Sequence, residues 1–250
     1  MVINVDVEFL ARDAARAARR GDLVIVIDVL RCSSTIVTAL ANGAKAIIPV
    51  KTLKEARRER LNKPDYILAG ERGGLKPRGF DLGNSPLEYT SERISGKVIV
   101  LTTTSGTRAL IYSRGARWIL VGSLLNAEAV AKAAYSIARS EDIGVTIVQS
   151  GTNGRFSLED FICAGAIVSK LPEGNIKLSD SAQASLLAFR YAKNNLRAIL
   201  MESAHSRRLI DLGFSRDIEF SCQMDYFRVV PIYDGNVIVR GDFRAGLEGT

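Results

Sequence analysis

Cysteine, histidine and tryptophan are scarce in this sequence, and long hydrophobic runs are missing. The 250 residues include three cysteines, one histidine and one tryptophan. Cys32, Cys163 and Cys222 are too few and too far apart for a disulfide framework or a zinc ribbon, which favours a reducing cytoplasm. No apolar run approaches the ~20 residues of a membrane-spanning helix. We therefore predict a cytoplasmic protein with no membrane partner.

The few candidates for histidine or cysteine catalysis are weak. His205 follows an alanine-rich helix, far along the chain from the polar motifs described below, so we expect no histidine base. Cys222 and Arg228 have the C-x5-R spacing of cysteine-dependent phosphatases, but the residues between them lack the glycines of a phosphate cradle. Cys32 lies beside Arg31 near an expected helix start, which can lower a thiol pKa, although a small buried apolar role is commoner.

The composition supports one large folded domain, which we assign to residues 1–250. Hydrophobic residues make up 47% of the chain and charged residues 24%. The formal net charge of +7 allows nucleic-acid binding, yet the basic residues are mixed with acids in amphipathic segments such as 54–60. We expect no nucleic-acid partner, because a basic field equally favours a small anionic substrate.

Strands and helices alternate along the first two thirds of the chain. Leu23 to Ile27 is a continuous apolar run, typical of a strand buried on both faces. Other strands are predicted at 2–7, 46–50, 66–69, 98–101, 118–121 and 145–149, and helices at 10–19, 35–41, 53–61, 107–113, 127–139 and 158–170. This alternation predicts a three-layer α/β/α fold with a mostly parallel sheet.

The pattern changes after Pro172. Helices are predicted at 181–194 and 196–210, followed by strands at 227–232 and 237–240. The two strands flank an Asp234-Gly235 turn, so they can form a β-hairpin, which we place at a sheet edge. Exposed apolar residues in this tail allow a homodimer.

The stretch from Gly70 to Ser85, GERGGLKPRGFDLGNS, fits neither a strand nor a helix. Its glycines indicate a loop of defined shape, and its charges of both signs suit an active site. Polar or glycine-rich groups also follow other predicted strands, at 28–31, 102–107, 122–123 and 150–152. Because ligands bind beyond the carboxyl ends of parallel strands, we expect these groups to share one crevice.

Phosphate is the ligand that this crevice best suits. Thr102 to Thr107, TTTSGT, offers hydroxyls and backbone N–H groups at a helix start, and Arg31 can clamp an oxyanion beside a second Ser/Thr run. Ordinary helix capping is the alternative for each run. Neither run is a Walker A loop, which disfavours a nucleotide triphosphatase. We assign substrate or phosphate binding to Ser33, Lys76, Thr103, Thr104, Ser105, Gly106, Thr107, Ser123 and Asn126.

Acidic residues at the same strand ends predict a hard divalent cation. Asp28 and Glu71 follow strands, and Glu159 and Asp160 lie in the first turn of a helix. Mg²⁺ prefers oxygen ligands and often joins one or two carboxylates to a substrate phosphate. Asp160 also fits a capping box with Ser157, a structural alternative. Asp28 is harder to explain structurally, because a carboxylate closing a buried strand is costly without a cation.

Five motifs together resemble the 2-phosphosulfolactate phosphatase family. They are DVLRCSST at 28–35, GERGGLKPRGFDLGNSP at 70–86, TTTSGTRAL at 102–110, GSLLNA at 122–127 and SLEDFICAG at 157–165. The resemblance extends from about residue 22 to Val230-Pro231, with the motifs in the same order. It implies a Mg²⁺-dependent, acid-type phosphatase that converts 2-phospho-3-sulfolactate and water to 3-sulfolactate and phosphate, a step toward coenzyme M.

Two departures from the family pattern affect the substrate assignment. The family commonly has Ala-Ser-Thr-Thr at 32–35, where this chain has Cys-Ser-Ser-Thr, and Asn in place of Ser105. Cysteine in an alanine position supports a non-catalytic thiol. A related phosphorylated hydroxy acid is therefore an alternative substrate.

The residues and the resemblance together predict metal-assisted hydrolysis of a phosphate monoester. We assign catalysis to Asp28, Arg31, Glu71 and Arg72, and Mg²⁺ binding to Asp28, Glu71, Glu159 and Asp160. Asp28 can act as the base or as a covalent nucleophile. Two alternatives are a lyase or isomerase acting on a phosphorylated carboxylate, and a non-catalytic protein that binds anionic metabolites or nucleic acid.

Overall fold

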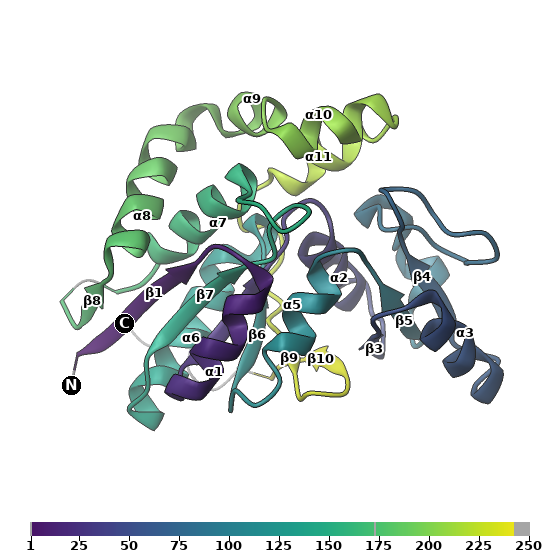
Figure 1. The fold of residues 1–250 in the computed structure, drawn as a ribbon, viewed down its shortest axis with the longest axis horizontal. Helices are drawn as coiled ribbons and strands as arrows, with labels where there is room; N and C mark the ends of the chain where they lie inside the picture. The colour runs from purple at the N-terminus through teal and green to yellow at the C-terminus, as the bar shows by residue number, and fades with distance from the viewer. Residues whose placement is uncertain (1, 173, 243–250) are drawn as a thin grey trace.

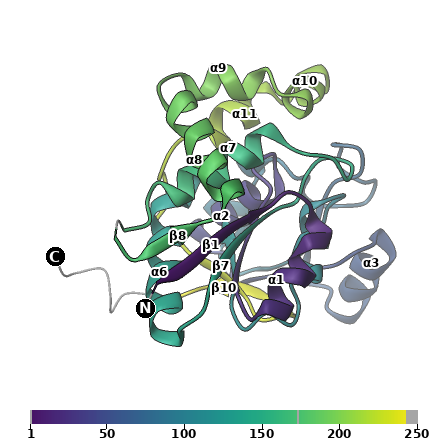
Figure 2. The same ribbon diagram turned by 60° about the vertical axis from the view of Figure 1, so that its left-hand side comes forward.

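One mostly parallel sheet runs through the protein, and helices cover both of its faces (Figures 1 and 2). The architecture comes from a computed structural model, which describes residues 2–172 and 174–242. The strands are β1 (Ile3–Glu8), β2 (Leu23–Ile27), β3 (Ala46–Pro49), β4 (Ile67–Gly70), β5 (Val98–Thr102), β6 (Ile119–Gly122), β7 (Val145–Gln149), β8 (Ile176–Leu178), β9 (Pro231–Tyr233) and β10 (Ile238–Arg240). Their order across the sheet is β4-β5-β3-β10-β9-β6-β2-β7-β1-β8.

Helices alternate with these strands, as the sequence predicts. The α-helices are α1 (Ala14–Arg20), α2 (Cys32–Ala41), α3 (Leu53–Asn62), α4 (Ser91–Ile94), α5 (Gly106–Tyr112), α6 (Ala127–Glu141), α7 (Leu158–Val168), α8 (Asp180–Ala192), α9 (Leu196–Met201), α10 (Ala204–Asp211) and α11 (Ser215–Ser221). Short 3-10 helices are η1 (Ala11–Asp13), η2 (Pro86–Glu88), η3 (Leu124–Asn126) and η4 (Lys193–Asn195). The predicted α/β class with a mostly parallel sheet is confirmed.

The buried strand β2 explains how two cores form, one on each face of the sheet. All five of its residues are buried, and it pairs in parallel with both β6 and β7. Alternate side chains point to opposite faces. Ile25 and Ile27 therefore join the core under α6, α7 and α8, whereas Val24 and Val26 join the core under α1, α2 and α5.

The predicted hairpin forms, but its expected position at a sheet edge is wrong. β9 and β10 pair antiparallel through Tyr233 and Ile238, and both residues are almost completely buried. β10 also pairs with β3 through Ile47, and β9 pairs with β6 through Leu120. The hairpin thus joins two groups of parallel strands in the middle of the sheet, where its apolar side chains enter the core.

The region after β8 departs most from the prediction. The single helix expected at 196–210 is divided into α9 and α10, because the Ser203 side chain accepts a hydrogen bond from Ser206 N at 3.1 Å and caps a new helix. β8 and α11 were not predicted, since three and seven residues are too short to show a clear period. In Figure 1, α9, α10 and α11 lie together at one end of the sheet.

Ser85 to Glu88 has the S-x-x-E pattern from which a capping box and a short helix are expected, but the box does not form. Ser85 Oγ donates to Asp217 Oδ1 at 2.6 Å, and Glu88 Oε2 accepts from Gly83 N at 3.0 Å. Both side chains serve contacts outside η2, which is one 3-10 turn.

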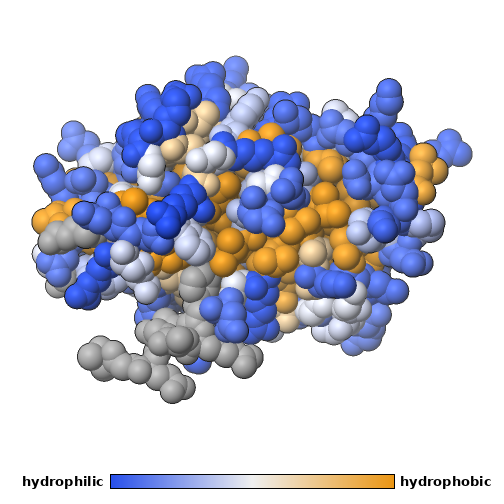
Figure 3. All heavy atoms as spheres, turned by 90° about the horizontal axis from the view of Figure 1, so that it is seen from below, coloured by the Kyte–Doolittle hydropathy of each residue, from blue (hydrophilic) through white to orange (hydrophobic). Residues whose placement is uncertain are grey.

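Within 2–172 and 174–242, no helix is long and apolar enough to cross a membrane. Figure 3 shows the face away from α9, α10 and α11, where apolar side chains gather in the middle and polar ones surround them. The homodimer stays a prediction.

Candidate active site

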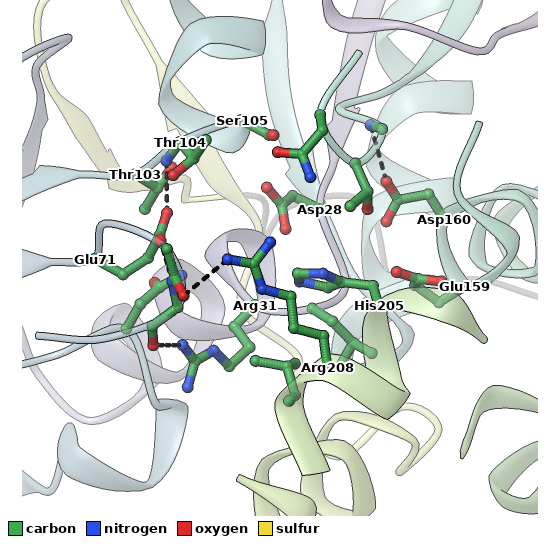
Figure 4. Close-up of a pocket in the computed structure, with 18 residues that line it drawn as sticks. Asp28, Arg31, Glu71, Thr103, Thr104, Ser105, Glu159, Asp160, His205 and Arg208 are labelled. Carbon is green, nitrogen blue, oxygen red and sulfur yellow. Dashed lines mark hydrogen bonds between the residues drawn. The ribbon is translucent and has the colours of Figure 1, made fainter. Parts of the chain in front are cut away.

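Loops that follow β2, β4, β5 and β7 converge on one pocket, and α10 closes its other side (Figure 4). Parallel strands bring such loops to the same end of the sheet. The residues predicted from the sequence that line this pocket are Asp28, Arg31, Glu71, Thr103, Thr104, Ser105, Glu159 and Asp160. The expected convergence of distant segments is therefore present.

Asp28 directly follows β2 and is only 8% exposed. Its Oδ1 accepts a hydrogen bond from Cys32 N at 3.2 Å, at the start of α2. Burial raises the pKa of Asp28 to about 7, and the negative charges of Glu71 and Glu159 act in the same direction, against the Cys32 hydrogen bond. Asp28 can therefore exist with or without its proton near neutral pH.

Glu71 ties the glycine-rich loop to the loop after β5. Its Oε2 accepts from Gly74 N at 2.7 Å, and its Oε1 accepts from Thr104 N at 2.6 Å. Gly70 makes this approach feasible, because its φ is +134° and a Cβ there would lie 1.9 Å from Thr102 O. Both oxygens of this carboxylate thus hold backbone in place around the pocket.

Asp160 joins the loops after β2 and β7 through hydrogen bonds to its carboxylate. Its Oδ1 accepts from Val29 N at 2.9 Å and its Oδ2 from Gly151 N at 3.2 Å, while burial raises its pKa. Only half of the expected capping box forms, with Asp160 N donating to Ser157 Oγ at 3.3 Å. The neighbouring Glu159 is 2% exposed, and its carboxylate points toward His205 (Figure 4).

The guanidinium of Arg31 is fixed by protein groups. Its Nη1 donates to Asp217 Oδ2 at 2.8 Å in a buried ion pair, and its Nη2 donates to Gly74 O at 2.5 Å. Its Cζ also lies 4.2 Å from the centre of the Phe214 ring. Asp217, which no sequence motif singled out, thereby connects α11 to the pocket.

Seven of the residues assigned to the site from the sequence lie outside the pocket lining: Ser33, Arg72, Lys76, Gly106, Thr107, Ser123 and Asn126. Several of them position groups that do line it. Ser33 Oγ accepts from Asp28 N at 3.0 Å, and Thr107 N donates to Thr103 Oγ1 at 3.0 Å.

The rest of this group makes contacts further from the cavity. Arg72 donates to Thr102 Oγ1 at 2.8 Å and to Lys51 O at 3.0 Å, and Lys76 is exposed. Ser123 and Asn126 form the capping box of η3 instead of capping α6. Gly106 packs against Asp28, since a Cβ there would lie 2.6 Å from Asp28 Oδ2.

His205 and Arg208 line the pocket, although the sequence separation argued against His205. They are three residues apart and so share one face of α10. That spacing was the available sequence signal, but only the fold brings α10 to the strand ends. His205 Nδ1 is buried and has no partner among the described residues, and burial lowers the pKa of this imidazole. Asn84 Oδ1 is buried and unpartnered in the same way.

The cysteines do not have the properties of nucleophiles. Burial raises the pKa of Cys32 well above its ordinary value, and the negative charge of Asp28 adds to this effect. Burial also raises the pKa of Cys222 to about 12. Both thiols are protonated near neutral pH, in agreement with the apolar role expected for Cys32 and with the rejection of Cys222 as a nucleophile.

The carboxylates of the pocket suit a cation that takes few of its ligands from the protein. In the described part of the chain, no three His, Cys, Asp or Glu side chains lie close enough to hold a metal ion together. The pocket nevertheless gathers four buried carboxylates, and its one buried arginine is already paired with Asp217. Such an excess of buried negative charge favours a cation. Mg²⁺ keeps several waters and needs only one or two carboxylates, so these residues fit it.

The fold and the pocket define an α/β protein with a ligand site at the ends of its parallel strands. The model of the family described as 2-phosphosulpholactate phosphatase matches residues 9–236. A relative named probable 2-phosphosulfolactate phosphatase from Thermotoga petrophila is 48% identical over 219 residues, covering 88% of this chain and 92% of the relative. Relatives of the same name from Carboxydothermus hydrogenoformans and Clostridium tetani are 42% and 39% identical, covering 95% and 94% of this chain and 97% and 100% of their own.

The chain therefore belongs to the 2-phosphosulfolactate phosphatase family. This confirms the resemblance drawn from its motifs and the phosphatase class that the resemblance implies.

Proposed function

We propose that the pocket hydrolyses a phosphorylated hydroxy acid, with 2-phosphosulfolactate as the substrate that family membership favours most. The reaction converts 2-phospho-3-sulfolactate and water to 3-sulfolactate and phosphate. One observation carries the proposal: four carboxylates from three separate segments are buried around one pocket in a chain of this family. Buried carboxylates are costly unless a cation or hydrogen bonds compensate them, so this gathering supports a charge-based reaction.

We also propose that Mg²⁺ is required. Asp28 and Glu159 would supply its oxygen ligands, while Glu71 and Asp160, which accept backbone hydrogen bonds with both oxygens, would hold the surrounding loops. A bound ion would neutralise charge on the phosphate and on the leaving oxygen.

The chain's own groups orient the substrate and handle the proton. The hydroxyl-bearing residues Thr103, Thr104 and Ser105 line one wall, where they can donate to phosphate oxygens. Asp28 can take the proton of the attacking water at a carboxylate oxygen that does not hold the ion. As a covalent nucleophile, Asp28 would instead bear a phosphoryl group that can be trapped.

Phosphate release is the direct test of this function. The purified chain should release phosphate from 2-phosphosulfolactate in the presence of Mg²⁺ and lose this activity with EDTA. Asp28→Asn should lower kcat by on the order of 100-fold or more. Asp211→Asn, which changes an exposed carboxylate of α10 outside the lining, should keep the wild-type rate. No phosphate from 2-phosphosulfolactate, 2-phospholactate or phosphoglycolate would contradict the proposal.

The same variant separates an enzyme from a non-catalytic anion binder. A binder should keep or improve its affinity for phosphate esters in Asp28→Asn, because a buried negative charge has been removed. An enzyme should bind the ester and fail to turn it over.

We further propose a reducing compartment and a homodimer. The thiols of Cys32, Cys163 and Cys222 are all free, which supports the first. Sedimentation equilibrium would test the second, since a monomer at micromolar concentration would contradict it.

A further inference from the structure

Three basic side chains line the pocket, and they differ in how far protein groups satisfy them. They belong to Arg31, His205 and Arg208. Arg31 is buried against Asp217 and Gly74 O. The imidazole of His205 faces the buried carboxylate of Glu159 (Figure 4). Arg31 is paired with Asp217, whereas Arg208 forms no ion pair with the described part of the chain.

The donors of Arg208 are largely available. Its Nη2 donates to Gly73 O at 3.3 Å, the one hydrogen bond that its guanidinium makes to the described part of the chain. Figure 4 shows the guanidinium pointing into the pocket, between His205 and the loop that carries Glu71. A guanidinium has five N–H donors in a rigid planar fork, which matches a carboxylate, sulfonate or phosphate. An anion beside the Arg208 guanidinium could therefore accept hydrogen bonds from its free N–H donors.

Packing holds α10, the helix that carries Arg208, in position before any ligand binds. The helix α10 starts at the Ser203 cap, and its Leu209 is 1% exposed in the core. A Cβ at Gly74 would lie 2.8 Å from Leu212 Cδ1, so glycine there lets the loop after β4 approach α10. The guanidinium thus stands on an anchored helix, which reduces the entropy lost when it binds.

Arg208 is more accessible than the acidic residues of the pocket. Asp28 and Glu159 are 8% and 2% exposed, whereas Arg208 is an exposed residue that reaches into the pocket from α10 (Figure 4). In the proposed function the phosphate lies at the buried carboxylates. The guanidinium of Arg208 can then meet another part of the substrate.

We propose that Arg208 is a specificity-determining residue that binds an acidic group of the substrate other than the phosphate. This inference rests on the proposed function and adds to it the residue that distinguishes a phosphorylated hydroxy acid from a simple alkyl phosphate. The carboxylate and the sulfonate of 2-phosphosulfolactate are both groups of this kind.

The test compares two esters in three variants. With 2-phosphosulfolactate, Arg208→Gln should lose on the order of 30-fold in kcat/KM, mainly through KM, because charged hydrogen bonds are removed. With ethyl phosphate, which has no second acid, the loss should be at least about tenfold smaller. Arg208→Lys should recover part of the preference. Arg207→Gln, an exposed neighbour outside the lining, should match the wild type on both esters.

Equal losses on the two esters would overturn the proposal, because Arg208 would then act on the phosphoryl group itself. No loss on either ester would overturn it as well.

Equilibrium binding of 3-sulfolactate, which has two acids and no phosphate, provides a second test that needs no catalysis. Arg208→Gln should weaken this binding at least about tenfold relative to Arg207→Gln. If the wild type releases no phosphate yet shows this difference, the proposed hydrolysis fails and the Arg208 site stands. If the wild type neither hydrolyses the esters nor binds 3-sulfolactate, both fail.

Discussion

Asp28 shows how strongly burial can change a single carboxyl group. Its pKa of about 7 lies far above the ordinary 3.8 because water is excluded and Glu71 and Glu159 lie nearby. Between these two values, the folded metal-free protein holds a proton that the unfolded chain has released. The free energy of unfolding contributed by this group therefore falls as pH rises through the window, by up to about 1.4 kcal/mol per unit.

Asp28→Asn should remove this pH dependence, because asparagine does not titrate. In EDTA, the variant should be more stable than the wild type at pH 7.5 by roughly 2 to 4 kcal/mol, and the difference should vanish near pH 4. Urea unfolding at pH 4, 5.5 and 7.5 measures both proteins. A variant that is less stable at pH 7.5, or a difference independent of pH, would show that the carboxyl is not held in its protonated form.

The buried ion pair of Arg31 and Asp217 supports a second prediction. Asp217→Ala would leave the Arg31 guanidinium buried without its carboxylate, which should cost about 3 to 5 kcal/mol of stability. Glu219→Ala, on the same helix, removes the exposed partner of Arg197 and should cost less than about 1 kcal/mol. Urea unfolding compares the two variants, and equal losses would mean that burial of the first pair has no special effect.

Single residues at strand ends could be identified from the sequence, whereas those on distant helices could not. Asp28 and Glu71 could be found because each directly follows a strand, so its place at the sheet end follows from local pattern. His205, Arg208 and Asp217 could not, because they reach the pocket only through the packing of helices distant in sequence.

At the scale of elements, the start of α5 is packed tightly against β2 and α2. A Cβ on Gly106 would lie 2.4 Å from Cys32 Cβ and 2.6 Å from Asp28 Oδ2. Gly106→Ala should therefore push α5 away from Asp28, with a stability loss of roughly 1 to 3 kcal/mol and a fall in phosphate release. Chemical unfolding and the phosphate assay report the two effects. If the variant keeps the wild-type stability and rate of phosphate release, the start of α5 has room for an added methyl group.

Element prediction succeeded where the apolar pattern was long and failed where it was short or misleading. β2 and β7 have the predicted bounds, since each is a five-residue run that buries both faces. The break between α9 and α10 was missed because helical residues continue across it, and only the Ser203 cap marks the new start.

At the scale of the whole molecule, the C-terminal hairpin holds the two parts of the sheet together. Ile238 is fully buried and lies between β3 and β9, whereas the adjacent Val239 is 37% exposed. Ile238→Ala should lower the stability of the entire protein by about 2 to 5 kcal/mol, and Val239→Ala by less than about 1 kcal/mol.

Urea unfolding followed by tryptophan fluorescence and by circular dichroism would check this, because both signals should shift together if the sheet unfolds as one unit. A shift in only one of the two signals would show that the sheet does not unfold as one unit. The sequence showed that two strands pair around a turn, but not that they enter the sheet centre, because that place depends on which strands lack a neighbour.

The most direct test of a metal-dependent phosphatase pocket is a crystal grown with Mn²⁺ in place of Mg²⁺ and with a phosphate analogue. The anomalous signal should place the ion against Asp28 and Glu159, with the analogue between the ion and the loop of Thr103 to Ser105. An ion bound elsewhere, or an analogue outside this pocket, would contradict the account.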